Sequence, residues 1–235
     1  MKRQAWAVIQ KATRGTMPES IVFNEDCMQG MKRYPDKYFD LAIVDPPYGI
    51  GENGQTNSSR DCLAKSKNYK AFAGHDREPE RQEYFDELIK LSKNQIIFGA
   101  NHFISKIPFD SPSWIVWNKN NGNTDFADCE LAYTSFKNAV RMFTYTWQGM
   151  LQQDMKNKEI RIHPTQKPVK LYEWILLNYA KPGDKILDTH VGSGSSRIAA
   201  YKHGFDYVGF EIDKDYFEAQ EKRFNEFKAQ QTFDF

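Results

Sequence analysis

The most informative part of the chain is Leu41-Ala42-Ile43-Val44-Asp45-Pro46-Pro47-Tyr48. Its four apolar residues predict a buried strand, and the prolines end that strand because neither can donate a hydrogen bond to a neighbouring strand. Asp45 and Tyr48 are therefore expected at the carboxyl end of a strand, where open α/β sheets bind ligands. An ordinary strand-to-loop corner, with Asp45 as a turn former, explains the tetrapeptide equally well when it is taken alone.

The tetrapeptide carries the groups needed to activate an exocyclic amine of a nucleobase. The lone pair of such an amine is delocalised into the ring, so the nitrogen is a poor nucleophile. Two acceptors, the Asp45 carboxylate and the main-chain carbonyl of Pro46, can take both N–H bonds and leave the lone pair localised. Tyr48 offers a ring on which the base can stack, a contact worth about 1–3 kcal/mol.

A second segment with the features of a ligand site lies far downstream. Residues 185–188 predict a strand, and Gly192 and Gly194 in the following turn let the backbone approach a ligand without a Cβ clash. Residues 207–210 predict another strand, followed by Glu211, an acidic residue placed to hold ribose hydroxyls. Such a turn occurs in both dinucleotide and S-adenosylmethionine sites, so it does not choose between them.

A third segment, His163-Pro164-Thr165-Gln166-Lys167-Pro168, completes a resemblance to the amino-methylating DNA methyltransferases that use S-adenosylmethionine. The Asp-Pro-Pro-Tyr form is similar to the adenine-N6 branch of that family. The order, with the catalytic tetrapeptide first and the cofactor glycines last, is similar to its circularly permuted β class. Matching segments extend over nearly all of residues 21–224.

The resemblance implies an α/β, Rossmann-like S-adenosylmethionine-dependent methyltransferase fold that is circularly permuted. Its mostly parallel sheet would be assembled from both ends of the chain, so that residues near Glu211 and near Asp26 become neighbours. The order of strand, helix and strand from residue 21 further predicts that Asp26 and Asp45 lie at the same end of two adjacent parallel strands.

The same resemblance implies the residues of the site. It assigns catalysis to Asp45, Pro46, Pro47 and Tyr48, and binding of S-adenosylmethionine to Asp26, Cys27, Thr165, Lys167, Asp188, Gly192, Gly194 and Glu211. Asp26 would bind the adenine amino group of the cofactor, and Thr165 with Lys167 would lie on its carboxylate side. Asn24, Glu25 and Asp26 fit a polar loop and helix cap about equally well. No metal site is predicted.

One departure from the family pattern lies in the segment that is expected to bind S-adenosylmethionine. The family commonly has Pro-Phe after the strand aspartate, whereas this chain has Thr189-His190. His190 is interpreted as a plain loop residue in preference to a compensating aromatic wall, and the departure leaves the affinity for the cofactor open.

We expect one domain over residues 21–235, after an N-terminal arm of residues 1–20. Residues 49–79 are long and polar, and they predict a mobile loop over the active site that contacts DNA. Residues 137–162 are locally basic and carry aromatic side chains, which favours a short target-recognition insert. A solvated loop and a charged surface excursion are the alternatives.

Further elements follow from periodicity. We expect helices over residues 80–93 and from Asn101 to Pro108, and a strand over 114–117. Residues 129–135 predict another strand, whose orientation, parallel or antiparallel, stays open. The aromatic face after Glu211 is interpreted as core.

Composition restricts the class of protein less than the motifs do. With 235 residues and 40% hydrophobic content, the chain can bury a substantial core. Its formal net charge of +1 neither supports nor opposes binding to nucleic acid. Three widely spaced cysteines indicate neither a disulfide framework nor a zinc site, and no apolar run approaches a membrane span. We therefore expect a cytoplasmic protein.

The sequence predicts a site-specific DNA adenine-N6 methyltransferase of the restriction-modification type, which flips its target adenine out of double-stranded DNA. Cytosine-N4 methylation is the first alternative, because it uses the same amine chemistry. A non-catalytic nucleic-acid-binding protein with a degenerate methyltransferase fold is the second, for which Thr189-His190 is the hint. Relatives of the β class suggest a homodimer. The sequence does not give the recognition site or decide between DNA and RNA.

Overall fold

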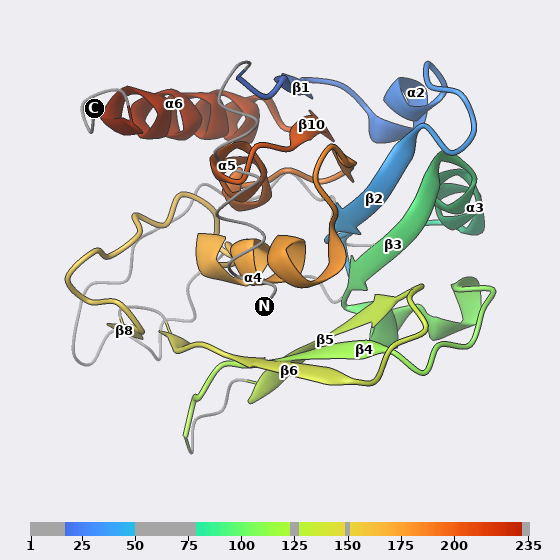
Figure 1. Ribbon diagram of the computed structural model, residues 1–235, viewed down its shortest axis with the longest axis horizontal. Coiled ribbons are helices and arrows are strands. Elements are labelled where there is room, and N and C mark those ends of the chain that lie inside the picture. Colours follow the sequence, from blue (N-terminus) through green and yellow to red (C-terminus); the bar gives the residue numbers. More distant parts are fainter. Residues whose placement is uncertain (1–16, 50–78, 123–126, 149–150, 232–235) are drawn as a thin grey trace.

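An eight-stranded sheet forms the centre of the protein, for which a computed structural model describes residues 17–49, 79–122, 127–148 and 151–231 (Figure 1). Its strands stand in the order β1-β10-β9-β2-β3-β5-β4-β6. Their bounds are β1 Ser20–Phe23, β2 Phe39–Val44, β3 Ser92–Phe98, β4 Trp114–Asn118, β5 Cys129–Thr134, β6 Arg141–Thr144, β9 Lys185–Asp188 and β10 Asp206–Phe210. In this sheet β5 alone runs against the other strands. The predicted fold class, a mostly parallel Rossmann-like sheet, is confirmed.

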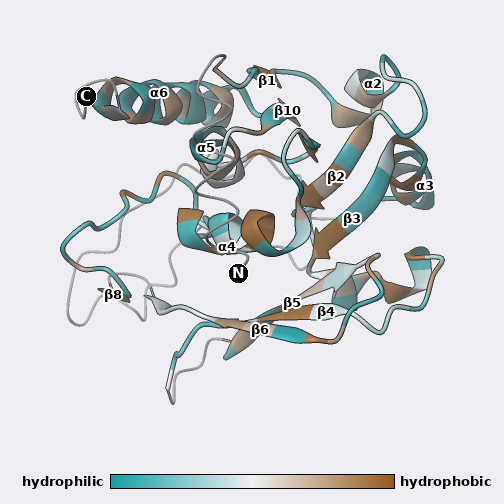
Figure 2. Ribbon diagram, viewed as in Figure 1, coloured by the Kyte–Doolittle hydropathy of each residue, from teal (hydrophilic) through white to brown (hydrophobic). Residues whose placement is uncertain are grey.

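Helices cover both faces of the sheet (Figure 1). The α-helices are α2 Cys27–Met31, α3 Gln82–Leu91, α4 Val169–Tyr179, α5 Ser195–Lys202 and α6 Lys214–Gln231. Two short 3₁₀ helices are η2 Ala100–His102 and η3 Ile104–Lys106. A separate two-stranded sheet consists of β7 Trp147–Gln148 and β8 Leu151–Gln152. Alternate residues of β2 enter different cores, because side chains of a strand alternate between its faces. Leu41 and Ile43 pack with α4 and α5, whereas Ala42 and Val44 pack with α2 and α3. The apolar ends of β2 and β3 stand out in Figure 2.

The two ends of the fold meet in the sheet, as the permuted order predicts. Phe23 of β1 pairs with Phe210 of β10, and the Glu211 N–H donates to the Phe23 carbonyl at 3.0 Å. Asn24 adds a side-chain bond to the Glu211 carbonyl at 2.8 Å. The expected proximity of Asp26 and Glu211 is therefore confirmed for the chain segments that carry them.

Several details differ from the sequence predictions. β1 and β2 are not adjacent, because β10 and β9 lie between them, so Asp26 and Asp45 share an edge of the sheet but not neighbouring strands. The helix expected from Asn101 is replaced by η2 and η3, because Phe103 between them leaves the helical region at φ −140°. β5 is antiparallel to both of its neighbours, an orientation that the sequence leaves open.

The predicted target-recognition insert, 137–162, begins inside the sheet, since β6 pairs with β4. The predicted loop, 49–79, and N-terminal arm, 1–20, fall for the most part outside the described residues. In the described part of the chain, no helix is long and apolar enough to cross a membrane.

A substitution at Gly30 of α2 can test how tightly this helix packs on β10. A Cβ at Gly30 would lie 2.2 Å from Cε1 of Phe210, a fully buried ring. Gly30→Ala should therefore lower the free energy of unfolding by about 1–3 kcal/mol, although alanine is ordinarily favoured in helices by about 1 kcal/mol. Urea denaturation measures the change, with the exposed Gln29→Ala as control. An unchanged or higher midpoint for Gly30→Ala would show that α2 can move away from β10.

Candidate functional site

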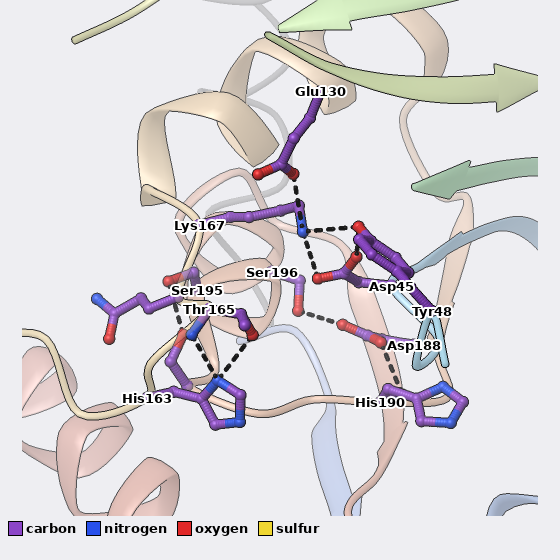
Figure 3. A network of polar contacts seen from close by, with 12 residues as sticks. Asp45, Tyr48, Glu130, His163, Thr165, Lys167, Asp188, His190, Ser195 and Ser196 are labelled. Atoms are coloured by element: carbon purple, nitrogen blue, oxygen red, sulfur yellow. Dashed lines mark hydrogen bonds and ion pairs between the residues drawn. The ribbon is translucent and has the colours of Figure 1, made fainter. Parts of the chain in front are cut away.

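Four neighbouring strands place acidic residues along one edge of the sheet. Because β1, β10, β9 and β2 are parallel, their carboxyl ends share that edge. The residues at or just after these ends are Asp26, Glu211, Asp188 and Asp45. The pairing of β2 with β9 brings the tetrapeptide beside the glycine turn, as Figure 3 shows for Asp45 and Asp188.

Tyr48 is held against the Asp45 carboxylate. Its hydroxyl donates to Asp45 Oδ1 at 2.6 Å. The ring stacks on His102 with centroids 5.0 Å apart and lies so close to Gly99 that a Cβ there would be 2.0 Å from Cε1 of Tyr48. Burial, followed by the charges of Asp45 and Glu130, raises the pKa of Tyr48 well above its usual value. The phenol therefore stays neutral and acts as a donor to Asp45.

Lys167 lies beside the tetrapeptide of residues 45–48. Its ammonium contacts Asp45 Oδ2 and lies 3.2 Å from Glu130 Oε2, while the residue is only 5% exposed. Burial alone would lower the pKa of Lys167, but the charges of Asp45 and Glu130 outweigh burial and raise it. Lys167 is therefore a buried cation paired with two carboxylates. Its expected contact with the carboxylate side of the cofactor stays a prediction.

Glu130 is a residue of the site that the sequence did not reveal. It lies on β5, where its Oε1 is 2.5 Å from Lys119 Nζ and its Oε2 faces Lys167. Burial would raise the pKa of Glu130, but the charges of Lys167 and Lys119 lower it, so the carboxylate is ionised. The one available signal was a charged residue within a strand that is otherwise largely apolar and close to the sheet interior.

Glu211 is fixed at the glycine turn by two backbone groups. Its Oε2 accepts from the Gly192 N–H at 2.8 Å, and its Oε1 accepts from the Asp213 N–H at 2.9 Å. Gly192 and Gly194 have φ values of +51° and +73°, a region that favours glycine. Burial raises the pKa of Glu211 in spite of these hydrogen bonds.

Asp188, at the end of β9, accepts hydrogen bonds from three groups around the glycine turn. Its Oδ2 accepts from the Ser196 hydroxyl at 2.5 Å and from the Tyr207 hydroxyl at 3.2 Å, and its Oδ1 accepts from the His190 N–H at 3.0 Å. Burial raises the pKa of Asp188. These bonds fix where α5 begins relative to β9 and β10.

Asp26 and Cys27 lie at the start of α2. Asp26 caps this helix, since its Oδ1 accepts from the Met28 N–H at 2.7 Å. The helix-cap interpretation of Asp26 is therefore correct, and a contact with the cofactor through its other oxygen stays a prediction. The Cys27 thiol is buried, and burial together with the charges of Glu80 and Asp26 raises its pKa, so the thiol is neutral.

The segment 163–168 spans the distance between the glycine turn and the tetrapeptide. The His163 ring packs against Tyr216 in a tilted arrangement with centroids 4.3 Å apart, and it is the nearest group to a Cβ built at Gly192, at 3.8 Å. Thr165 Oγ1 lies 3.0 Å from His163 Nδ1. Burial, followed by the charges of Lys167 and Arg161, lowers the pKa of His163 to about 4. A neutral His163 thus lies by the turn, while Lys167 reaches Asp45.

His190 forms an ion pair that neither interpretation of this residue anticipated. Its Nε2 is 3.3 Å from Glu80 Oε1, and its Nδ1 is 2.9 Å from Thr189 Oγ1. Thr189 Oγ1 in turn lies 2.6 Å from the buried Tyr84 hydroxyl of α3. Burial opposes the charge of His190, but Glu80, Asp188 and Glu211 raise its pKa. Thr189 and His190 therefore connect the glycine turn to the start of α3 through these contacts.

The pair of His190 and Glu80 should make stability depend on pH. Because the folded-state pKa of His190 is raised, its contribution is complete below the unfolded-state value of about 6.5 and is lost as the pH rises through the folded-state value. Glu80→Gln should lower the free energy of unfolding by about 0.5–1 kcal/mol near pH 5.5, and by less near pH 9. Urea denaturation at both pH values measures this difference.

Glu83→Gln is the matched control, since it removes the same charge from an exposed position in the first turn of α3. Its effect on stability should not decline across this pH range. An equal loss for Glu80→Gln at both pH values would show that His190 contributes no charge to the pair.

Comparisons with known proteins agree with this geometry. The N6/N4 methyltransferase family model, described as DNA methylase, matches residues 119–222. The type II methyltransferase M2.MboI of Moraxella bovis is 25% identical over 240 residues, which cover 87% of each chain.

Solved structures show the same fold at low identity. The complex of M1.HpyAVI with SAM has a TM-score of 0.54 and 23% identity, covering 86% of this chain and 98% of that one. The PvuII DNA methyltransferase, which is cytosine-N4-specific, has a TM-score of 0.54 and 14% identity, covering 92% and 95%. The family match, the relatives and the motifs assembled at one sheet edge agree: the chain is similar to the amino-methylating DNA methyltransferases.

Proposed function

We propose that this protein transfers a methyl group from S-adenosylmethionine to the N6 amino group of an adenine flipped out of double-stranded DNA. The observation that carries the proposal is the position of the Asp45 carboxylate at the end of β2, directly beside the strand that leads into the glycine turn. An acceptor for an amine and a turn suited to a donor thus share one edge of the sheet. The type II relatives support a place in restriction-modification.

The residues of the turn fit the donor. S-adenosylmethionine supplies a methyl carbon bonded to a cationic sulfur, together with ribose hydroxyls that donate hydrogen bonds. Glu211 is held by two backbone N–H groups, and each of its oxygens keeps a further lone pair for a hydroxyl. A Cβ at Gly192 would lie 3.8 Å from the His163 ring, so this ring borders the turn at which the donor would bind. Asp26 and Thr165 are further candidate ligands.

Asp45 and its neighbours would act on the target amine by positioning and by charge. The Asp45 carboxylate and the Pro46 carbonyl accept the amine N–H bonds and aim the lone pair at the methyl carbon. The negative Asp45 stabilises the positive charge that develops on the amine during transfer. Tyr48 supplies a stacking ring whose orientation is fixed by His102. No covalent intermediate with the protein is needed.

The segment 137–162 supplies candidate DNA contacts. Its described part exposes four cationic side chains, Lys137, Arg141, Lys156 and Lys158, which suit phosphate oxygens. It also exposes apolar side chains, among them Met142, Met155 and Ile160, which suit contact with bases. We therefore keep this segment as the target-recognition element. A homodimer and a cytoplasmic location stay predictions.

Nucleoside analysis tests the reaction directly. DNA incubated with the protein and isotope-labelled S-adenosylmethionine is digested to nucleosides and examined by mass spectrometry. Labelled N6-methyladenine is expected. Labelled N4-methylcytosine would overturn the choice of adenine, and the absence of any labelled base together with intact DNA binding would indicate a non-catalytic binding protein.

Asp45→Ala should lower kcat by about 100-fold or more, because it removes the acceptor for the amine. The affinity for S-adenosylmethionine should stay unchanged, because Asp45 is not among the proposed ligands of the donor. Single-turnover assays and calorimetry measure the two quantities. Asp36→Ala, at an exposed carboxylate before the same strand, is the control. Full activity in Asp45→Ala would overturn the assigned role.

Glu211→Ala should instead weaken binding of S-adenosylmethionine by about tenfold or more, since a charged hydrogen bond contributes about 1.5–3 kcal/mol. Calorimetry of the protein without DNA measures this affinity. Glu218→Ala, on the exposed face of α6, serves as the control. If the Glu211→Ala protein binds S-adenosylmethionine with normal affinity, the ribose hydroxyls must bind to another residue.

A further inference from the structure

Four charged side chains alternate in sign between β4 and the catalytic tetrapeptide. Lys119 is paired with Glu130, Glu130 with Lys167, and Lys167 with Asp45. Figure 3 shows Lys167 lying between Glu130 and Asp45, with its ammonium also directed at Tyr48. Lys167 and Glu130 come from separate parts of the fold, the segment before α4 and the strand β5. This row of ion pairs therefore extends from Lys119, just after β4, to the Asp45 carboxylate.

The row has a direct consequence for the target amine. In this structure both oxygens of Asp45 already accept hydrogen bonds, Oδ1 from Tyr48 at 2.6 Å and Oδ2 from Lys167. An ammonium is a stronger donor than a neutral aromatic amine, because its charge assists the hydrogen bond. Lys167 and the amine therefore compete for the same carboxylate, and the ammonium wins unless another group attracts it.

Glu130 is the group that can attract it. It is ionised, it lies 3.2 Å from the ammonium, and Lys119 holds its other oxygen in place. We propose that Glu130 is a positioning residue of the amine site, which draws the Lys167 ammonium away from Asp45 so that Asp45 can bind the target amine. The inference rests on the proposed function, and it places Lys167 in the amine site and not on the donor.

Glu130→Gln tests the proposal, because it removes the charge but keeps the shape. With Glu130 neutral, Lys167 remains on Asp45, so kcat/KM for DNA should fall at least tenfold while the affinity for S-adenosylmethionine changes less than twofold. Glu130→Asp keeps the charge and should recover part of the activity. Should Glu130→Gln fail to fold in a thermal melt, the comparison of Glu130→Asp with Lys119→Met, which removes only the outer cation, replaces it. Glu130→Asp should then lower kcat/KM more than Lys119→Met does.

A double-mutant cycle separates action through Lys167 from a general structural effect. In a Lys167→Met background, adding Glu130→Gln should change kcat/KM less than twofold. A full tenfold loss in both backgrounds would show that Glu130 acts without Lys167 and would overturn the proposal. A tenfold weaker affinity of Lys167→Met for S-adenosylmethionine would do the same, since it would return Lys167 to the donor site.

The outcome is distinguishable from a failure of the proposed function. If the wild-type protein forms no methylated base, the reaction itself is wrong. If the wild-type protein methylates DNA and Glu130→Gln matches it, only the role of Glu130 is wrong.

Discussion

The parallel pairing of β2 with β9 is the contact on which the site depends. Leu41 pairs with Ile186 and Ala42 with Leu187, which joins the part of the chain that carries Asp45 to the part that carries the glycine turn. Without this contact, Asp45 and the glycine turn would belong to separate units. The pairing is buried on both sides, because Leu41 and Ala42 enter different cores. Hydrophobic burial thus fixes the position of Asp45 relative to the glycine turn.

Much of this arrangement was accessible from the sequence because it follows from local signals. Apolar runs ended by prolines or glycines located the strand ends, and acidic residues at those ends located the edge of the sheet. The meeting of the two chain ends also followed from the family order, whereas the orientation of β5 was left open. The adjacency of Asp26 and Asp45 was wrong, because chain order does not fix strand order in a permuted sheet.

What the sequence did not give are contacts between distant, individually unremarkable residues. Lys167 and Asp45 are 122 positions apart, and Glu80 and His190 are 110 positions apart. Glu130 lay in a segment recognised only as a strand. Such partners depend on side-chain directions across a finished sheet, which no periodicity encodes. Buried charges of this kind persist only when paired, since an isolated one is strongly disfavoured. The ion pairs therefore mark the places where the fold keeps charged groups buried close to the proposed site.

The pairing of β1 with β10 has a consequence for how the protein is made. Ser20 pairs with Tyr207, so β1 finds its partner only after synthesis has passed β10, almost 190 residues later. Contacts this distant in sequence slow folding, because a long loop must close before they form. Until then β1 has an unsatisfied edge, and its Ile21-Val22-Phe23 segment is available for pairing with other chains. The permuted order thus leaves nascent copies open to association before the last strand arrives.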